Sequence, residues 1–355
     1  VGSNESKAGN PDLTWEKAIK WNVGADVKFW GDRIGLTFDY FMEHRDNILC
    51  NRNTVPTIIG ISASNLPAYN MGRMRNSGWD GEISVGDRIG DWSYFVKANF
   101  TYAHNKILEQ DEVIRNEDYL YRTGLRYGQF FGYVADGIFN SWEEVNAAGQ
   151  PEYVMANNNN KIQPGDVRYV DINGDGKIND DDQVPIGYSN FPEIMYGISL
   201  GGSYKNLDIS LLFQGATHVS NMPSRRIMRG FYEYTGANRD LLKSWSYERF
   251  VNNQKIVYPR YGVNGVGHNY LTSTYWLEDA SYLRLKNVEV GYTFRQESLK
   301  KAGIGSIRIY VNGSNLLTWT DMLPGQDPEV ANAGVTNSEP YPVTRVFNFG
   351  LNVNF

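Results

Sequence analysis

Runs of alternating apolar and polar residues, paired and joined by very short turns, dominate this sequence. Residues 19–29 alternate, Gly31-Asp32 turns the chain, and residues 34–42 alternate on the way back. The same plan returns around Gly90-Asp91 and around Lys205-Asn206. Because successive side chains of a β-strand point to opposite faces, a period of two predicts antiparallel strands with one apolar and one polar face.

The closing part of the chain continues this pattern. Within residues 283–294 the apolar positions switch parity near Lys286-Asn287, which predicts a β-bulge. In the last run, residues 347–355, Phe, Leu and Val alternate with Asn and Gly up to the terminal Phe355. The whole pattern predicts about nine strands of about 11 to 16 residues, whereas strands of globular proteins have about 5 to 6.

Long segments rich in Gly, Asn, Pro and aromatic residues lie between the hairpins. They cover residues 50–70, 109–192, 218–274 and 318–342. Loops of this length are uncommon in compact domains and usually carry function. Tight turns at one end of the strands and long loops at the other are the layout of bacterial outer-membrane barrels, with turns in the periplasm and loops outside.

Alternation alone also fits a soluble β-sandwich. Three features favour a membrane barrel: strands long enough to cross a bilayer at a tilt, aromatic residues near strand ends, and charges in the interior of the polar face. These interior charges are Lys20, Asp26, Asp39, Lys97, Asp208 and Arg308. We therefore predict an all-β fold, an antiparallel up-and-down transmembrane β-barrel with long external loops, and keep a soluble all-β protein as the alternative.

Composition narrows the function classes. The formal net charge of −6, without any long run of Lys and Arg, argues against nucleic acid as a partner. No apolar stretch is long enough for a transmembrane helix, which does not exclude barrel strands. The single cysteine, Cys50, excludes a disulfide framework within the chain. The first residues lack the features of a signal peptide, so the chain is either mature or begins inside something longer.

The sharpest local motif is residues 171–182, inside the loop 109–192. It fits a calcium loop, with a Gly at the sharp turn and oxygen ligands at the expected spacing. The predicted ligands are Asp171, Asn173, Asp175, the carbonyl of Lys177, Asn179 and Asp182. We predict a structural Ca²⁺ that holds this external loop. A merely solvated acidic turn is the alternative, because Asn, Asp and Gly cluster in turns anyway.

Catalysis has little support in the sequence, and we predict that the protein is not an enzyme. The four histidines, His44, His104, His218 and His268, are far apart, and no pair has metal-ligand spacing. Aromatic residues of the loops could stack on sugar rings, or could equally hold the loops together; we assign none of them as a site. They are Tyr119, Tyr121, Phe130, Phe131, Trp142, Tyr232, Tyr234, Tyr261 and Tyr270.

Several stretches, in order along nearly the whole chain, carry a family resemblance. They include Asn10-Pro-Asp-Leu-Thr-Trp-Glu16, Gly132-Tyr-Val-Ala-Asp-Gly-Ile-Phe139, Pro164-Gly-Asp-Val-Arg-Tyr-Val-Asp171, Leu277-Glu-Asp-Ala-Ser-Tyr-Leu-Arg-Leu-Lys-Asn287, Gly313-Ser-Asn-Leu316, Pro328-Glu329 and Phe355. In these stretches the chain resembles the SusC/RagA family of TonB-dependent outer-membrane transporters from Bacteroidetes-type bacteria.

The resemblance implies a fold, a location and partners. Members carry a plug and a barrel of about 22 strands, so this chain would be roughly the last nine strands, completed by other parts of the same molecule. It implies active import, across the cell outer membrane, of oligosaccharides and in some members peptides. The cargo would be held under a SusD-like surface lipoprotein, and TonB would act through the plug that is missing from this chain.

Two soluble alternatives remain open from the residues. One is a secreted, calcium-stabilised all-β module that binds glycans. The weaker one is an all-β glycoside hydrolase, because Asp and Glu are abundant enough to supply a carboxylate pair. Solubility separates these from a barrel, because only a barrel needs detergent for extraction.

Overall fold

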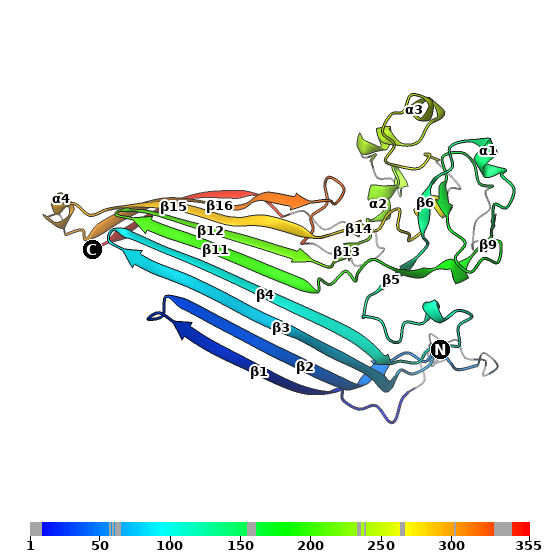
Figure 1. The fold of residues 1–355 in the computed structure, drawn as a ribbon, viewed down its shortest axis with the longest axis horizontal. Helices are drawn as coiled ribbons and strands as arrows, with labels where there is room; N and C mark the ends of the chain where they lie inside the picture. The colour runs from blue at the N-terminus through cyan, green and yellow to red at the C-terminus, as the bar shows by residue number, and fades with distance from the viewer. Residues whose placement is uncertain are drawn as a thin grey trace, which may run out of the picture.

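The computed structural model describes residues 9–56, 58, 60, 65–154, 161–232, 236–237, 239–262, 267–301, 303–329 and 343–355. Across these residues, no helix has the length and apolar character needed to cross a membrane. Strands account for most of the regular structure (Figure 1).

One large antiparallel sheet contains the long strands. Each strand pairs with its neighbours in chain order, as the up-and-down prediction requires. The nine strands are β1 (Lys17–Phe29), β2 (Ile34–Cys50), β3 (Tyr69–Ile89), β4 (Trp92–Glu109), β11 (Ile194–Tyr204), β12 (Leu207–Thr217), β15 (Tyr282–Phe294), β16 (Ser306–Thr320) and β17 (Val346–Asn354). The predicted strand number is therefore confirmed, and so is the bulge, because the β15–β16 register shifts between Leu285 and Asn287.

Strand lengths differ from the prediction in one respect. They range from 9 residues in β17 to 21 in β3, a wider spread than about 11 to 16. The first half of β3 carries Gly, Arg and Asn without alternation, so the sequence pattern did not reveal it. Pairing with β2 on one side and β4 on the other holds this segment extended.

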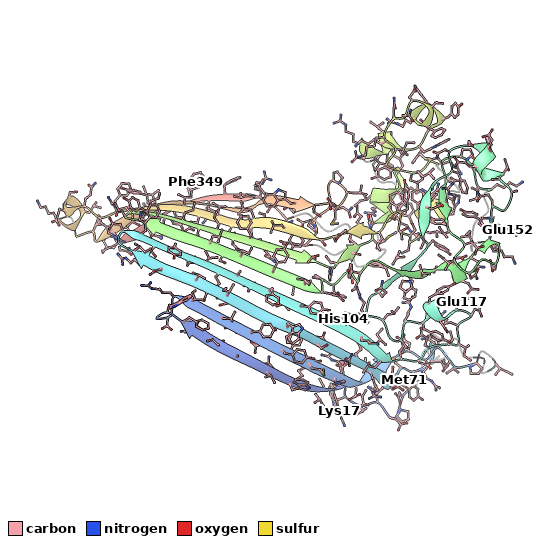
Figure 2. All side chains as sticks on the ribbon, in the orientation of Figure 1. Lys17, Met71, His104, Glu117, Glu152 and Phe349 are labelled. Atoms are coloured by element: carbon pink, nitrogen blue, oxygen red, sulfur yellow. The ribbon has the colours of Figure 1, made fainter. Side chains whose placement is uncertain are left out.

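The two faces of the sheet differ in chemistry. On one face, apolar side chains stand in cross-strand rows; Trp79 packs against Phe38 and Tyr40 with ring centroids 5.2 and 4.5 Å apart. On the other face, ion pairs join neighbouring strands, such as Lys97 with Glu82 at 2.9 Å. Large hydrophobic residues of the first face are exposed, including Phe349 on β17 (Figure 2). An apolar outer face and a polar inner face are the pattern of a membrane barrel wall.

The connections between strands also differ at the two ends of the sheet. At one end the chain turns tightly, through Trp30 to Asp32 and through Lys205, all of which have positive φ. The short helix α4 (Glu297–Lys301) lies at this end as well. At the opposite end the chain forms the long loops, which carry the remaining small elements (Figure 1). This is the predicted asymmetry of turns and loops.

The long loops pack together into what we call the loop cap. Its strands are β5 (Phe130–Gly132), β6 (Ala135–Ile138), β7 (Glu152–Tyr153), β8 (Val167–Tyr169), β9 (Lys177–Ile178), β10 (Val184–Ile186), β13 (Ser220–Asn221) and β14 (Glu278–Asp279). They form four two-stranded sheets: β5 with β10, β6 with β8, β7 with β9 and β13 with β14.

Short helices complete the loop cap. They are α1 (Trp142–Val145), α2 (Arg225–Met228), α3 (Tyr247–Val251) and the 3₁₀ turns η3 (Asp118–Leu120), η4 (Asp180–Asp182), η6 (Arg239–Lys243) and η7 (Gly267–Tyr270). Two buried clusters form its core, one around Tyr258 and Trp276 and the other around Val167 and Ile178. The buried hydrophobic core of the described residues thus lies mostly in the cap rather than on the sheet.

Candidate functional site

Three cavities open on the polar face of the sheet where it meets the loop cap. Their volumes are about 640, 340 and 480 Å³, in the range of small-ligand sites. Phe191 lines all three, and its side chain is 56% exposed although it lies among polar strand residues. The segment 189–193, which leads into β11, is therefore the centre of the candidate site.

Two serines fix this segment against the loop cap. The buried Ser189 accepts a hydrogen bond from the Phe191 backbone amide at 3.1 Å. The Ser220 hydroxyl accepts one from the Tyr188 amide at 2.9 Å, and the Ser220 amide donates to the Ser189 carbonyl at 3.0 Å. Gly187 packs so closely on Ser220 that an added Cβ would lie 2.6 Å from the hydroxyl. Phe191 is thus presented by a rigid segment.

Glu193, at the end of that segment, contacts basic residues from three parts of the chain. Its carboxylate lies 2.7 Å from Nδ1 of His104, 3.4 Å from Nδ1 of His218 and 3.4 Å from Nε of Arg126. His104 belongs to β4, at the cap end of the sheet (Figure 2). No sequence pattern predicts this cluster, because His104 and Glu193 are 89 residues apart in the chain.

A second ionic cluster ties the loop after β16 to the sheet. Arg284, only 3% exposed, donates to Thr318 at 2.9 Å and to Asp327 at 2.8 Å. Lys286 at the bulge binds Glu329 at 2.7 Å. Burial opposes ionisation of Asp327, but hydrogen bonds from the Glu329 amide and from Arg284 outweigh it and lower its pKa. The strand stretch 277–287 and Pro328-Glu329, quoted above as separate motifs, therefore meet in space.

Asp166 joins the two largest loops inside the cap. This carboxylate is fully buried and lies 3.1 Å from Nε2 of His268, next to Arg260 and 2.9 Å from Nδ2 of Asn269. Burial alone would raise its pKa, but the hydrogen bonds and charges of His268 and Arg260 outweigh burial and lower the pKa. Asp166 belongs to the 164–171 stretch. Through Asp166, that stretch connects the loop 109–192 to the loop 218–274.

The structure brings the two ends of the predicted calcium loop together. The Asp171 carboxylate accepts hydrogen bonds from the amides of Gly174 and Gly176, at 2.7 and 2.8 Å. The buried Asp182 carboxylate accepts from the amides of Ile172 and Asn179, both at 2.8 Å. Position 12 of the motif therefore closes the loop onto positions 2 and 9.

The other predicted ligands follow the same arrangement. Asn173 accepts from the Asp175 amide at 3.0 Å, Asp175 from the Lys177 amide at 2.8 Å and Asn179 from the Asp181 amide at 2.6 Å. Gly176 has a φ of 79°, a conformation that favours glycine at the sharp turn. The predicted metal ligands are all oxygen atoms, which Ca²⁺ prefers.

The carboxylates of this loop are bound by backbone amides. Among the described residues, no group of three or more His, Cys, Asp and Glu side chains is arranged to hold a metal ion. The donor chemistry and the turns fit a Ca²⁺ loop, and the coordination itself stays a prediction.

The loop aromatics divide into packed and exposed residues. Tyr270 is buried in the cap core and Phe130 packs against it, so both hold the loops together. Tyr119 donates to the Asp181 carbonyl at 2.7 Å and so braces the predicted calcium loop. Trp142 is exposed on α1. Tyr234 lies outside the described residues.

A sheet of long strands with an apolar outer face, a polar inner face and a loop cap at one end defines the wall of an outer-membrane β-barrel. Residues 1–183 match the family described as TonB dependent receptor-like, beta-barrel. The chain belongs to this family, whose members reside in the cell outer membrane.

Curated relatives match almost the whole chain. It is 28% identical to TonB-dependent receptor P3 of Formosa agariphila over 98% of its own length and 35% of the relative. It is 25% identical to TonB-dependent receptor SusC of Bacteroides thetaiotaomicron over 99% of its length and 33% of the relative. The chain thus spans about a third of the curated relatives that it matches.

Solved structures share the fold. The RagAB peptide transporter superposes with a TM-score of 0.72 at 24% identity, covering 98% of this chain and 36% of that chain. The RagAB peptide importer in the open-open state gives 0.71 at 23% identity, with 99% and 36% covered. The fold of the sheet and loop cap is therefore shared with the RagAB structures.

Proposed function

We propose that this chain is the C-terminal wall of a TonB-dependent transporter that imports large nutrients across the outer membrane. One observation carries the proposal: a single nine-stranded sheet has an exposed apolar face, while its polar face opens into cavities beneath the loop cap. A water-soluble protein would have to cover the apolar face, and a bilayer covers it without further structure.

The family suggests the rest of the machinery. We propose that the cargo is an oligosaccharide or a peptide, held on the loop-cap side under a SusD-like surface lipoprotein. TonB would supply energy through a plug domain of the complete transporter. Transport rather than catalysis is proposed, in line with relatives that are named TonB-dependent receptors.

Fractionation of the cell membranes, followed by purification of the protein, tests the proposal. A tagged protein should be extracted from the outer membrane only by detergent, should migrate differently on gels with and without heating, and should co-purify with a surface lipoprotein. Cells that lack it should lose uptake of oligosaccharides or of peptides. Recovery of the protein from the culture medium, soluble without detergent, would contradict transport and support the secreted glycan-binding alternative.

A further inference from the structure

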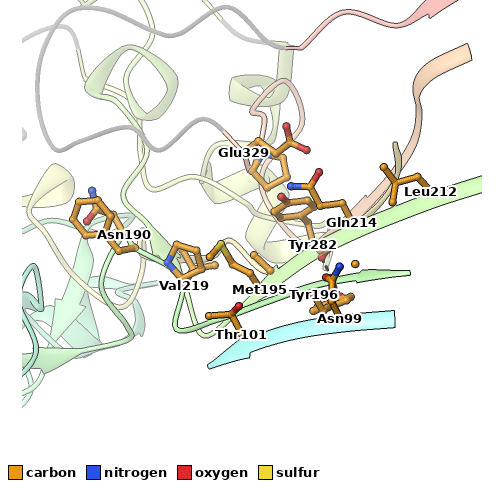
Figure 3. A pocket seen from close by; sticks show the side chains of 16 residues that line it. Asn99, Thr101, Asn190, Met195, Tyr196, Leu212, Gln214, Val219, Tyr282 and Glu329 are labelled. Atoms are coloured by element: carbon orange, nitrogen blue, oxygen red, sulfur yellow. Dashed lines mark hydrogen bonds between the residues drawn. The ribbon is translucent and has the colours of Figure 1, made fainter. Parts of the chain in front are cut away.

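The largest of the three cavities described above is lined by a cross-strand row of residues. Asn99 of β4 lies opposite Gly197 of β11, and Gly197 lies opposite Gln214 of β12. All three belong to the polar face and line the cavity of about 640 Å³. Figure 3 shows Asn99 and Gln214 on strands that flank β11, with the cap loops above them.

The Asn99 carboxamide lies directly over the backbone of Gly197. Neighbouring strands are about 4.8 Å apart, so the backbones that carry Asn99 and Gln214 are separated by roughly 10 Å. Both side chains are exposed, and Gly197 between them is buried. A Cβ at Gly197 would lie 2.9 Å from Oδ1 of Asn99. Glycine therefore leaves room for the Asn99 carboxamide to lie over β11, between β4 and the β12 strand that carries Gln214.

The amides are available to a ligand, whereas the charges beside them are not. Within the described residues, neither the side chain of Asn99 nor that of Gln214 makes a hydrogen bond to another group. Their outer neighbours in the row are Glu82 and Arg284. Glu82 pairs with Lys97 at 2.9 Å, and Arg284 is held by its carboxylate partners. The groove therefore offers neutral hydrogen-bonding groups.

Apolar groups complete the groove walls. Phe191 and Met195 line the same cavity, with side chains 56% and 50% exposed. A carboxamide combines two donors with an acceptor, which matches hydroxyl groups that both donate and accept. An aromatic face beside such amides suits the C–H face of a sugar ring, because it is apolar and rigid.

The row is less suited to a peptide. Extended peptides commonly bind by adding a strand to an open sheet edge. β4, β11 and β12 each have paired neighbours on both sides, so no backbone edge is open here. Peptide termini or charged side chains would also need unpaired charges, and the nearest charges are already paired.

We propose that Asn99, Gly197, Gln214 and Phe191 form a subsite for one ring of an uncharged oligosaccharide. The proposal rests on the transport function above and narrows its cargo to neutral glycan. The two amides bind hydroxyls of the ring, and the ring lies against Phe191.

Native mass spectrometry of the detergent-purified protein tests the subsite. The probe is a pool of neutral oligosaccharides from partial hydrolysis of plant and algal polysaccharides, with a hexapeptide pool for comparison. The unaltered protein should bind members of the neutral pool. Asn99→Ala and Gln214→Ala should each weaken that binding about tenfold. Gln214→Glu, which keeps the size and adds a charge, should weaken it as well.

A matched control uses Asn22→Ala, which removes an exposed amide of the same face from β1, outside the groove. Its binding should stay within twofold of the unaltered protein. Binding of peptides alone, of no neutral glycan, or equal binding by the groove variants and the control would overturn the subsite. None of these outcomes would change detergent extraction or heat-dependent migration. Failure of the subsite would therefore leave the transport proposal standing, because that proposal has its own test.

Discussion

Asp166 shows how much the loop cap depends on one carboxylate. Its charge is buried with Arg260 and His268, residues from another long loop. Removal of one member of a buried ionic group leaves the others uncompensated, at a cost of about 3 to 5 kcal/mol. Asp166→Asn should therefore make the cap sensitive to protease at lower urea concentrations, while the sheet keeps its heat-dependent migration. Limited proteolysis in detergent measures both.

The control for that substitution is another aspartate of the cap. Asp136 pairs with Arg168, but its side chain is 50% exposed. Exposed pairs contribute about 1 kcal/mol or less, so Asp136→Asn should leave the protease profile nearly unchanged. Equal effects of the two substitutions would show that burial of Asp166 is not what stabilises the cap.

The same carboxylate gives the cap a pH dependence. Although burial opposes it, His268 and Arg260 hold the pKa of Asp166 below the unfolded value of about 3.9. A lowered folded pKa means that the stabilisation is complete above about pH 4 and is lost as the pH falls through the folded pKa. Digestion with an acid-active protease should therefore accelerate below pH 4. The dependence should be weaker in Asp166→Asn and should persist in Asp136→Asn.

At the scale of elements, the sequence predicted the strands better than it predicted the cap. In long strands with one apolar face, apolar and polar residues alternate strictly, so the pattern predicted hairpins such as β1–β2. The first half of β3 was not, because pairing on both sides, rather than its own residues, keeps it extended. The small cap strands have two to four residues, too few to display a period.

The contacts that build the candidate site could not be predicted from a single sequence for a similar reason. Asp166 and Arg260 are 94 residues apart, and Glu193 contacts two histidines, one from strand β4 and one from the loop after β12. Charged residues are frequent in every loop, so no spacing marks the partners. The calcium-type motif was visible because its oxygens are close in sequence, although its metal stays a prediction.

The predicted calcium loop gives a prediction about metal removal. Ca²⁺ should bind the detergent-purified protein in calorimetric titration, and chelation should expose residues 164–187 to protease while the sheet remains intact. Asp171→Ala and Asp182→Asn should abolish the titration signal. Glu152→Gln, an exposed acid on the neighbouring β7, should leave it unchanged. Absence of a signal from the unaltered protein would reduce the motif to a solvated acidic turn.

At the scale of the whole molecule, the sheet and the loop cap have different roles. The apolar face of the sheet is suited to lipid, its polar face lines the cavities, and the cap covers one end (Figure 1). Ionic clusters around Glu193 and Arg284 join cap to sheet at two separate places. The cavities are therefore bounded on one side by the sheet, whose apolar face is suited to lipid. On the other side they are bounded by the loops of the cap, which ionic clusters connect to the sheet.

The two faces of the sheet predict different outcomes when arginine replaces each of two adjacent residues of β12. Leu211 faces Leu200 and Val288 on the apolar side, whereas Ser210 lies opposite Glu289 on the polar side. An arginine on the lipid face near the bilayer centre costs about 2 to 4 kcal/mol, and one on the lumen side costs little. Leu211→Arg should therefore lower the urea midpoint of the protein in lipid vesicles. Ser210→Arg, near the Glu289 carboxylate, should leave the midpoint almost unchanged. The reverse order would place the apolar face inside the barrel and contradict the proposed membrane wall.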